Sequence, residues 1–129
     1  MSKFTAEQVP QLNANLKTPQ EVLKWSFDNL HPRLAMASSF GAEDVVVIDM
    51  MMKINPKARI FTLDTGRLNQ ETYDVMDEIR KKYNVSIEVM FPDQNEVEQM
   101  VRVNGLNLFY HSVGNIKLCC GIRKVHPLN

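Results

Sequence analysis

The sequence predicts an α/β fold, with a parallel sheet and helices on both faces of it. Short apolar runs typical of buried strands alternate with longer runs of helical periodicity, and this alternation occurs three times along the chain. Parallel strands need a crossover of helix length between them, so strands that alternate with helices indicate a parallel sheet. The chain has 129 residues, of which 44% are hydrophobic and 23% charged, which suits one globular domain.

The first part of the chain gives one weak helix signal and one strong one. Residues 1–17 are weakly patterned, and we expect Pro10 to disrupt the short helix that their apolar spacing suggests. In Thr18-Pro19-Gln20-Glu21 a capping box coincides with proline at the first helical position, so a helix begins there and ends at His31-Pro32. We therefore divide the chain into an N-terminal segment, 1–17, and one domain, 18–129.

The rest of the domain is organised around a strand–turn–helix at residues 33–54. Arg33–Ala37 is predicted to be a buried strand, Ser38–Gly41 a small polar turn and Ala42–Ile54 an apolar helix. Such a turn brings free backbone N–H groups and the positive end of a helix dipole together, so we expect it to hold a phosphate or sulfate group. An ordinary strand–helix turn explains the pattern equally well, with the acidic pair Glu43-Asp44 favoured there by the dipole alone.

A second strand, Arg59–Leu63, leads into the loop Asp64-Thr65-Gly66-Arg67 and a helix over Asn69–Tyr83. Ligands of parallel α/β sheets bind beyond the carboxyl ends of the strands, where both loops are expected to lie. In the second loop, Asp64 has the chemistry to accept from a ribose hydroxyl or a base amine, and Arg67 to pair with an anion. The alternative is a helix-entry turn with a surface arginine.

The C-terminal third is predicted to contain a strand over Ser86–Met90, a helix over Gln94–Val103 and an irregular stretch over Gly105–Gly114. The chain then runs to Cys119-Cys120-Gly121-Ile122-Arg123-Lys124, which sets two soft ligands beside two cations. Iron–sulfur clusters are held by thiolates, and nearby positive charge favours a thiolate. Two buried structural cysteines beside a solvated basic pair are the alternative. We expect the domain to be incomplete at its C-terminus.

Composition limits the classes of partner. Fifteen basic residues balance fifteen acidic ones, so the chain has no bulk electrostatic reason to bind nucleic acid or an anionic membrane. The N-terminus does not resemble a secretory signal, and the run Val45–Met52 is too short to span a bilayer. We therefore predict a cytoplasmic location. Its only cysteines are adjacent and would be kept reduced there, which excludes a disulfide framework and leaves reactive or metal-binding thiols.

Three motifs, in this order, resemble the assimilatory sulfonucleotide reductases, the adenylyl-sulfate and phosphoadenylyl-sulfate reductase family. They are Ser38-Ser39-Phe40-Gly41-Ala42-Glu43-Asp44, Leu63-Asp64-Thr65-Gly66-Arg67, and the cysteine motif, which continues to Pro127-Leu128. The resemblance extends over residues 18–129, about the first half of a family member, and implies the adenine-nucleotide alpha-hydrolase-like (PP-loop) fold. The cysteine motif is typical of the iron–sulfur branch, which mostly reduces adenylyl sulfate.

The resemblance implies reduction of adenylyl sulfate, or phosphoadenylyl sulfate, to sulfite and a nucleotide in sulfate assimilation and cysteine biosynthesis. Thioredoxin or glutaredoxin would donate the electrons. Cys119 and Cys120 would be two of the four ligands of a [4Fe–4S] cluster. The implied substrate-binding residues are Ser38, Ser39, Phe40, Gly41, Glu43 and Asp44 around the phosphosulfate, Leu63, Asp64, Thr65, Gly66 and Arg67 near the adenosine, and Arg123 and Lys124 at the sulfate end.

The chain departs from the family pattern in the cysteines that would bind the cluster and carry out the reduction. The family's later Cys-x-x-Cys pair and its nucleophilic cysteine are absent, because Cys119 and Cys120 are the only cysteines. We therefore assign no catalytic residue and expect this polypeptide alone to be inactive as a reductase. A non-redox adenine-nucleotide-binding module is the alternative. A pyrophosphatase-type enzyme that cleaves ATP ranks last, because the Ser-Gly-Gly-x-Asp-Ser loop of such enzymes is missing. An unpaired sheet edge would favour self-association.

Overall fold

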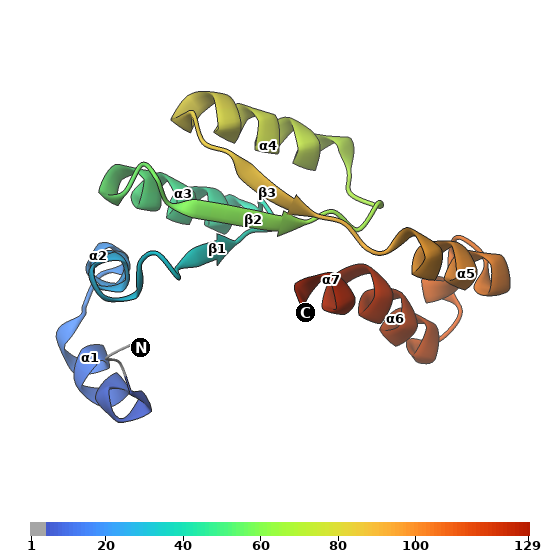
Figure 1. The fold of residues 1–129 in the computed structure, drawn as a ribbon, viewed down its shortest axis with the longest axis horizontal. Coiled ribbons are helices and arrows are strands. Elements are labelled where there is room, and N and C mark those ends of the chain that lie inside the picture. Colours follow the sequence, from blue (N-terminus) through green and yellow to red (C-terminus); the bar gives the residue numbers. More distant parts are fainter. Residues whose placement is uncertain (1–4) are drawn as a thin grey trace.

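The computed structural model describes residues 5–129 as strands and helices around a small parallel sheet (Figure 1). The elements are η1 (Ala6–Gln8), α1 (Val9–Asn15), α2 (Pro19–Leu30), β1 (Ala35–Ala37), α3 (Ala42–Ile54), β2 (Arg59–Leu63), α4 (Gln70–Tyr83), β3 (Ile87–Met90), α5 (Gln94–Asn104), η2 (Leu108–Tyr110), α6 (Val113–Cys120), the π-helical turn η3 (Gly121–Val125) and α7 (His126–Leu128). Within these residues, no helix is both long enough and apolar enough to cross a bilayer.

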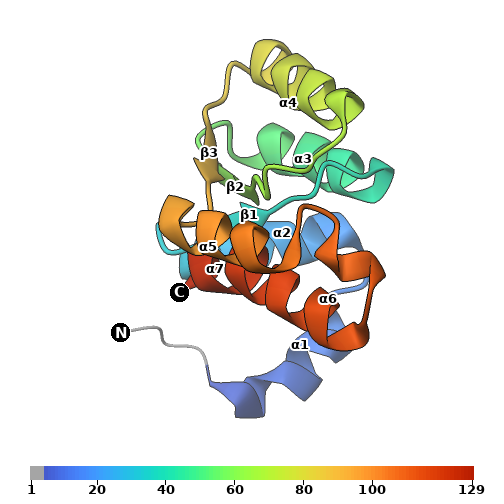
Figure 2. The ribbon, with the colours of Figure 1, turned by 90° about the vertical axis from the view of Figure 1, so that its right-hand side faces the viewer.

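The sheet has the order β1-β2-β3, and both strand pairs are parallel. Ile60 of the central strand pairs in register with Ile87, and Phe61 pairs with Glu88. Because successive side chains of a strand alternate between faces, these two pairs lie on opposite faces of the sheet. Helices α3 and α4 lie on the same side of the sheet (Figure 2). The predicted parallel α/β architecture is confirmed, and its helices cover the two faces unequally.

The main core lies between the sheet and the helices α2, α3 and α4. Ile48 of α3 and Ile60 of β2 are fully buried at its centre. The other buried members of this cluster are Phe27, Phe40, Met51, Met52, Ala58, Met76 and Ile79. Methionines fill irregular gaps well because their side chains are unbranched and flexible, which explains the methionine run in α3 as core packing.

The capping signals of the sequence correctly locate α2. Thr18 Oγ1 accepts a hydrogen bond from the Glu21 N–H at 3.2 Å, and Glu21 Oε2 accepts from the Thr18 N–H at 2.9 Å, completing the box. The expectation that Pro10 disrupts the preceding helix was wrong. Pro10 lies in the first turn of α1, where its missing N–H costs no intrahelical hydrogen bond.

The C-terminal segment is more regular than the sequence indicates. Residues predicted to be irregular contain η2 and the start of α6, and the cysteine motif lies on the helical segment α6–η3–α7. Ser112 begins that segment by accepting a hydrogen bond from the Asn115 N–H at 3.1 Å. A second, smaller core of Met100, Leu108 and Cys119 attaches this segment to α5. Those contacts join parts of the chain that are distant in sequence, so no local periodicity predicts them.

Candidate functional site

The turn between β1 and α3 is closed by its own carboxylate. Asp44, in the first turn of α3, accepts through Oδ2 from the Ser39 N–H at 2.6 Å, the Ser39 hydroxyl at 3.0 Å and the Ser38 hydroxyl at 3.1 Å. The Phe40 N–H donates to Ser38 Oγ at 3.0 Å. The Ser38 N–H donates to the Phe61 carbonyl at 2.9 Å, so three of the turn's N–H groups are occupied, which corrects the expectation of free backbone N–H groups for an anion.

The carboxylate of Asp44 is stabilised in its charged form. Burial acts to raise the pKa of Asp44, but the hydrogen bonds from Ser39 and Ser38 outweigh it and hold the pKa below its ordinary value. A negative charge is thus built into the positive end of the α3 dipole. Glu43, its neighbour, is exposed. Any ligand anion must approach this turn from the side that Asp44 leaves open.

Phe40 anchors the turn to the core. Its backbone is in the left-handed region, with φ of 60°, and its side chain is only 6% exposed within the main hydrophobic cluster. A bulky residue seldom adopts positive φ unless the surrounding structure enforces it. Burial of the ring supplies that enforcement, so the aromatic side chain determines the shape of the turn.

The loop after β2 contains a buried carboxylate that faces away from the first turn. Asp64 accepts from the Gly66 N–H at 2.8 Å and from the Tyr73 hydroxyl at 2.9 Å. The hydrogen bond to Asp64, together with burial, raises the pKa of Tyr73. Asp64 and Tyr73 line a separate cavity of about 400 Å³ between α4 and β3. The sequence prediction treated Asp64 as a free acceptor, whereas its oxygens already have protein donors.

Two arginines connect this loop to the C-terminal segment. Arg67 donates to the Leu106 carbonyl and to Asn107 Oδ1, each at 3.0 Å. Arg123, which is 7% exposed, donates from Nη1 to the Thr65 carbonyl at 2.6 Å. The guanidinium of Arg123 also requires Gly66: a Cβ there would lie 3.3 Å from Nη1, and the φ of +72° disfavours a side chain.

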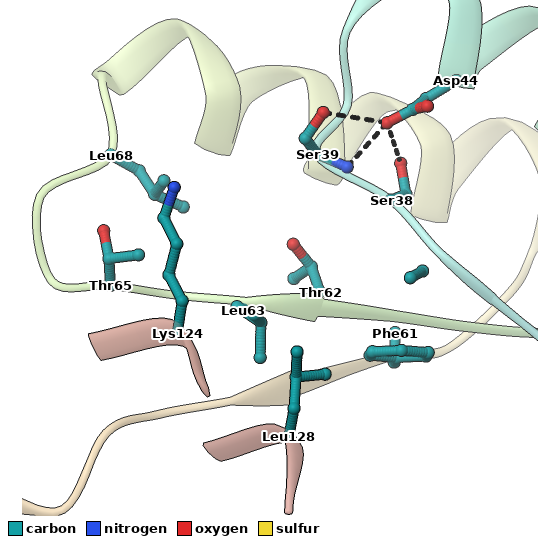
Figure 3. Close-up of a pocket in the computed structure, with 11 residues that line it drawn as sticks. Ser38, Ser39, Asp44, Phe61, Thr62, Leu63, Thr65, Leu68, Lys124 and Leu128 are labelled. Carbon is teal, nitrogen blue, oxygen red and sulfur yellow. Dashed lines mark hydrogen bonds between the residues drawn. The ribbon is translucent and has the colours of Figure 1, made fainter. Parts of the chain in front are cut away.

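A cleft of about 400 Å³ lies at the carboxyl ends of β1 and β2 (Figure 3). Small-molecule sites usually have volumes of this order and combine apolar walls with a few polar groups. Lys124 extends from the C-terminal segment into it, past Leu63 and Thr65 (Figure 3). The residues that line the cleft are Ala37, Ser38, Ser39, Asp44, Phe61, Thr62, Leu63, Thr65, Leu68, Lys124 and Leu128.

The cleft brings together six of the residues that the sequence singled out. They come from all three motifs: Ser38, Ser39 and Asp44 from the first, Leu63 and Thr65 from the second, and Lys124 from the third. The others lie outside its lining: Phe40, Gly41, Glu43, Asp64, Gly66, Arg67 and Arg123.

Sequence reasoning missed the apolar walls of the cleft, formed by Phe61, Leu68 and Leu128, and the hydroxyl of Thr62. Strand alternation alone could have flagged Phe61, because it shares the face opposite Ile60 with Leu63. Leu128 follows Lys124 by four residues, so helical spacing would have placed the two on one side if the helix had been predicted.

The cysteine pair lies beside a smaller cavity of about 170 Å³, whose other lining residues include Thr65, Arg67 and Arg123. Cys119 is buried and Cys120 is partly exposed, and both are free thiols. Among residues 5–129, no group of three or more His, Cys, Asp or Glu side chains is arranged to hold a metal ion. The two thiols and the neighbouring cations fit half of a four-thiolate cluster site, and the chain's described residues offer no further ligand there.

Together these features define an α/β protein whose ligand cleft lies at the carboxyl edge of a parallel sheet, with a cation contributed from the C-terminal segment. The sequence profile of the phosphoadenosine phosphosulfate reductase domain matches residues 33–129. The chain belongs to this family.

Relatives of the chain come from bacteria and plants. It is 43% identical to an adenosine 5'-phosphosulfate reductase from Pseudomonas aeruginosa, over 93% of this chain and 45% of that protein. It is 36% identical to adenosine 5'-phosphosulfate reductase 2 from Bacillus subtilis, over 92% of this chain and 49% of that protein. The chain thus spans about half the length of these relatives.

Among solved structures, the fold matches a phosphoadenylyl-sulfate reductase from Candida auris, described as a phosphate complex. The TM-score is 0.80 at 26% identity, covering 98% of this chain and 61% of the other. The likeness therefore includes the C-terminal helical segment as well as the sheet.

Proposed function

We propose that the chain is the substrate-binding part of an adenylyl-sulfate reductase. The reaction would reduce adenylyl sulfate with two electrons from a dithiol such as thioredoxin or glutaredoxin. The sulfur–oxygen bond of the phosphosulfate breaks, sulfite and AMP leave, and the dithiol becomes a disulfide. The observation that carries this proposal is the cleft that joins Lys124 to the first two family motifs.

The chemistry of the cleft supports this substrate class. The Lys124 ammonium would pair with the sulfate or phosphate oxygens, and the hydroxyl of Thr65 would donate to the same group. The apolar side chains of Phe61 and Leu128 would contact the less polar adenosine.

A [4Fe–4S] cluster is the cofactor that the cysteine pair fits best. Cys119 and Cys120 would supply two thiolate ligands, and the remaining two would have to come from outside this chain. When bound, the cluster would add a charged iron–sulfur group near Arg123 and Lys124. Iron and acid-labile sulfide analysis of anaerobically purified protein tests this assignment, and Cys119→Ser is expected to lower the iron content.

Calorimetric titration with adenylyl sulfate, phosphoadenylyl sulfate and AMP tests the substrate. We expect binding of adenylyl sulfate, weakened about tenfold by Lys124→Met because a direct ion pair is lost. Lys117→Met is the matched control, since this exposed lysine lies on the same helical segment. Absence of heat with all three nucleotides would overturn the proposal.

The same titration separates the proposal from the non-redox alternative. A module built only for adenine nucleotides would bind AMP and adenylyl sulfate equally, and Lys124→Met would weaken both to the same extent. A reductase cleft prefers adenylyl sulfate, because only that ligand offers a sulfate to the ammonium.

We also propose that the chain is cytoplasmic and self-associates. Large apolar side chains are exposed along the C-terminal half, including Val103 at 74%, Leu106 at 65% and Val113 at 68%. β1 also forms an edge of the sheet. Exposed apolar surface and open strand edges both favour association. Sedimentation that is independent of concentration would contradict the association, and cell fractionation tests the location.

A further inference from the structure

We propose that Arg67 is a positioning residue that couples the loop after β2 to the cysteine-bearing helix. The proposal deepens the proposed function, on which it rests. Arg67 belongs to the second family motif, and the sequence predicts that it binds the substrate. Its side chain instead contacts Leu106 and Asn107, which follow it in the chain by 39 and 40 residues.

Three contacts hold the Arg67 guanidinium against the segment 106–109. Its two terminal nitrogens donate to the Leu106 carbonyl and to Asn107 Oδ1, each at 3.0 Å. Its central carbon lies 4.8 Å from the centre of the Phe109 ring, a distance typical of a cation–π contact. A planar guanidinium is suited to two divergent acceptors and a ring face together, and an ammonium is not.

The segment 106–109, which Arg67 contacts, is the part of the fold that supports the cysteines. Leu108, at its centre, is fully buried and shares a hydrophobic cluster with Cys119, while Phe109 packs against that cluster. The Tyr110 and His111 N–H groups close the η2 turn on the Asn107 and Leu108 carbonyls. Holding this turn in place therefore keeps Cys119 buried.

A second link returns from the cysteine segment to the same loop. Arg123 Nη1 donates to the Thr65 carbonyl at 2.6 Å, two residues before Arg67. Arg67, Arg123 and both cysteines line the same small cavity of about 170 Å³. The loop and the cysteine segment are thus joined from both sides, and neither arginine lines the proposed substrate cleft.

The test measures the cysteines and the nucleotide separately in the full 129-residue chain. Iodoacetamide labelling, read by mass spectrometry of the cysteine peptide, reports access to Cys119. We expect Arg67→Ala and Arg67→Lys to speed Cys119 labelling about tenfold, because local opening of η2 becomes easier. Arg102→Ala, which removes an exposed arginine of α5, is the matched control and leaves the rate unchanged.

Two further readouts separate positioning from general destabilisation and from substrate contact. Hydrogen exchange is expected to accelerate at Tyr110 and His111 in the Arg67 variants while the amides of β2 keep their wild-type rates. The affinity for AMP is expected to change less than about twofold, since no contact to the ligand is removed. Asn107→Ala should reproduce the faster labelling, and combining it with Arg67→Ala should add less than the sum of the two.

Unchanged Cys119 labelling in Arg67→Ala would overturn the proposal, as would full rescue by lysine. Weaker nucleotide binding with unchanged labelling would identify Arg67 as a ligand of the substrate instead. If the wild-type chain binds no nucleotide at all, the proposed function fails, while the labelling and exchange measurements still decide the role of Arg67.

Discussion

The Asp44 carboxylate accepts a hydrogen bond from the Ser39 backbone N–H at 2.6 Å, across the turn between β1 and α3. This contact makes the turn a preformed structure that holds its own negative charge. A ligand anion that enters the cleft would meet the Lys124 ammonium, because the protons of both serine hydroxyls are already donated to Asp44. The relationship explains how an acidic residue and a proposed sulfonucleotide site share one turn.

Replacing Asp44 by alanine is expected to destabilise the fold by about 1–2 kcal/mol, because three hydrogen bonds to the carboxylate are lost at a helix N-terminus. Urea denaturation followed by circular dichroism measures the loss. Glu43→Ala is the matched control: Glu43 is exposed in the same helical turn, and its removal should cost no more than about 0.5 kcal/mol. Equal losses in the two variants would contradict a role of Asp44 in holding the turn.

The same carboxylate predicts a pH dependence of stability. The pKa of Asp44 is lower in the folded state than its ordinary value, so the charged form stabilises the fold above the unfolded pKa of about 3.9. That contribution is lost as the pH falls through the folded value. The stability difference between the wild type and Asp44→Asn should therefore be constant above about pH 5 and shrink below about pH 4. A difference that grows in acid would exclude this explanation.

Phe40→Ala should cost about 3–5 kcal/mol, because it leaves a cavity in the main core where the ring is 6% exposed. It should also loosen the turn, since burial of the ring holds the backbone at φ of 60°. Phe91→Ala is the control, as Phe91 is 64% exposed, and we expect a change within about 0.5 kcal/mol. Thermal unfolding of the two variants distinguishes them, and similar melting temperatures would count against the anchor.

Gly66→Ala should destabilise the protein by about 1–2 kcal/mol, since alanine is strained at φ of +72° and its Cβ would crowd Arg123. Gly121→Ala offers the opposite case: its backbone is helical, and an added Cβ would meet no atom within 4 Å. There, alanine should raise stability by about 0.5–1 kcal/mol. The two free energies of unfolding should differ in sign, and a shared sign would contradict the backbone argument.

Local signals in the sequence were sufficient for the elements from α2 to α5. The Thr18–Glu21 box began α2, and Asp93 capped α5, accepting from the Glu96 N–H at 3.0 Å. The C-terminal helices were missed because α6 and η3 are short, and their burial depends on contacts with α5 and η2. Helices of this length are marginal without tertiary packing, so their sequences need not show a clear amphipathic period.

The sequence by itself determined the alternation of strands and helices, the parallel sheet and the three motifs that identify the family. Each of these depends on residues that are close together in the chain, and periodicity, helix caps and motif spacing can therefore be recognised from the sequence alone. Only the tertiary structure decided which motif residues meet. It turned Asp64 toward Tyr73, directed Arg67 to Asn107, and brought Lys124 into the cleft with Ser39. Side-chain direction depends on partners that are distant in sequence, and folding alone brings those partners together.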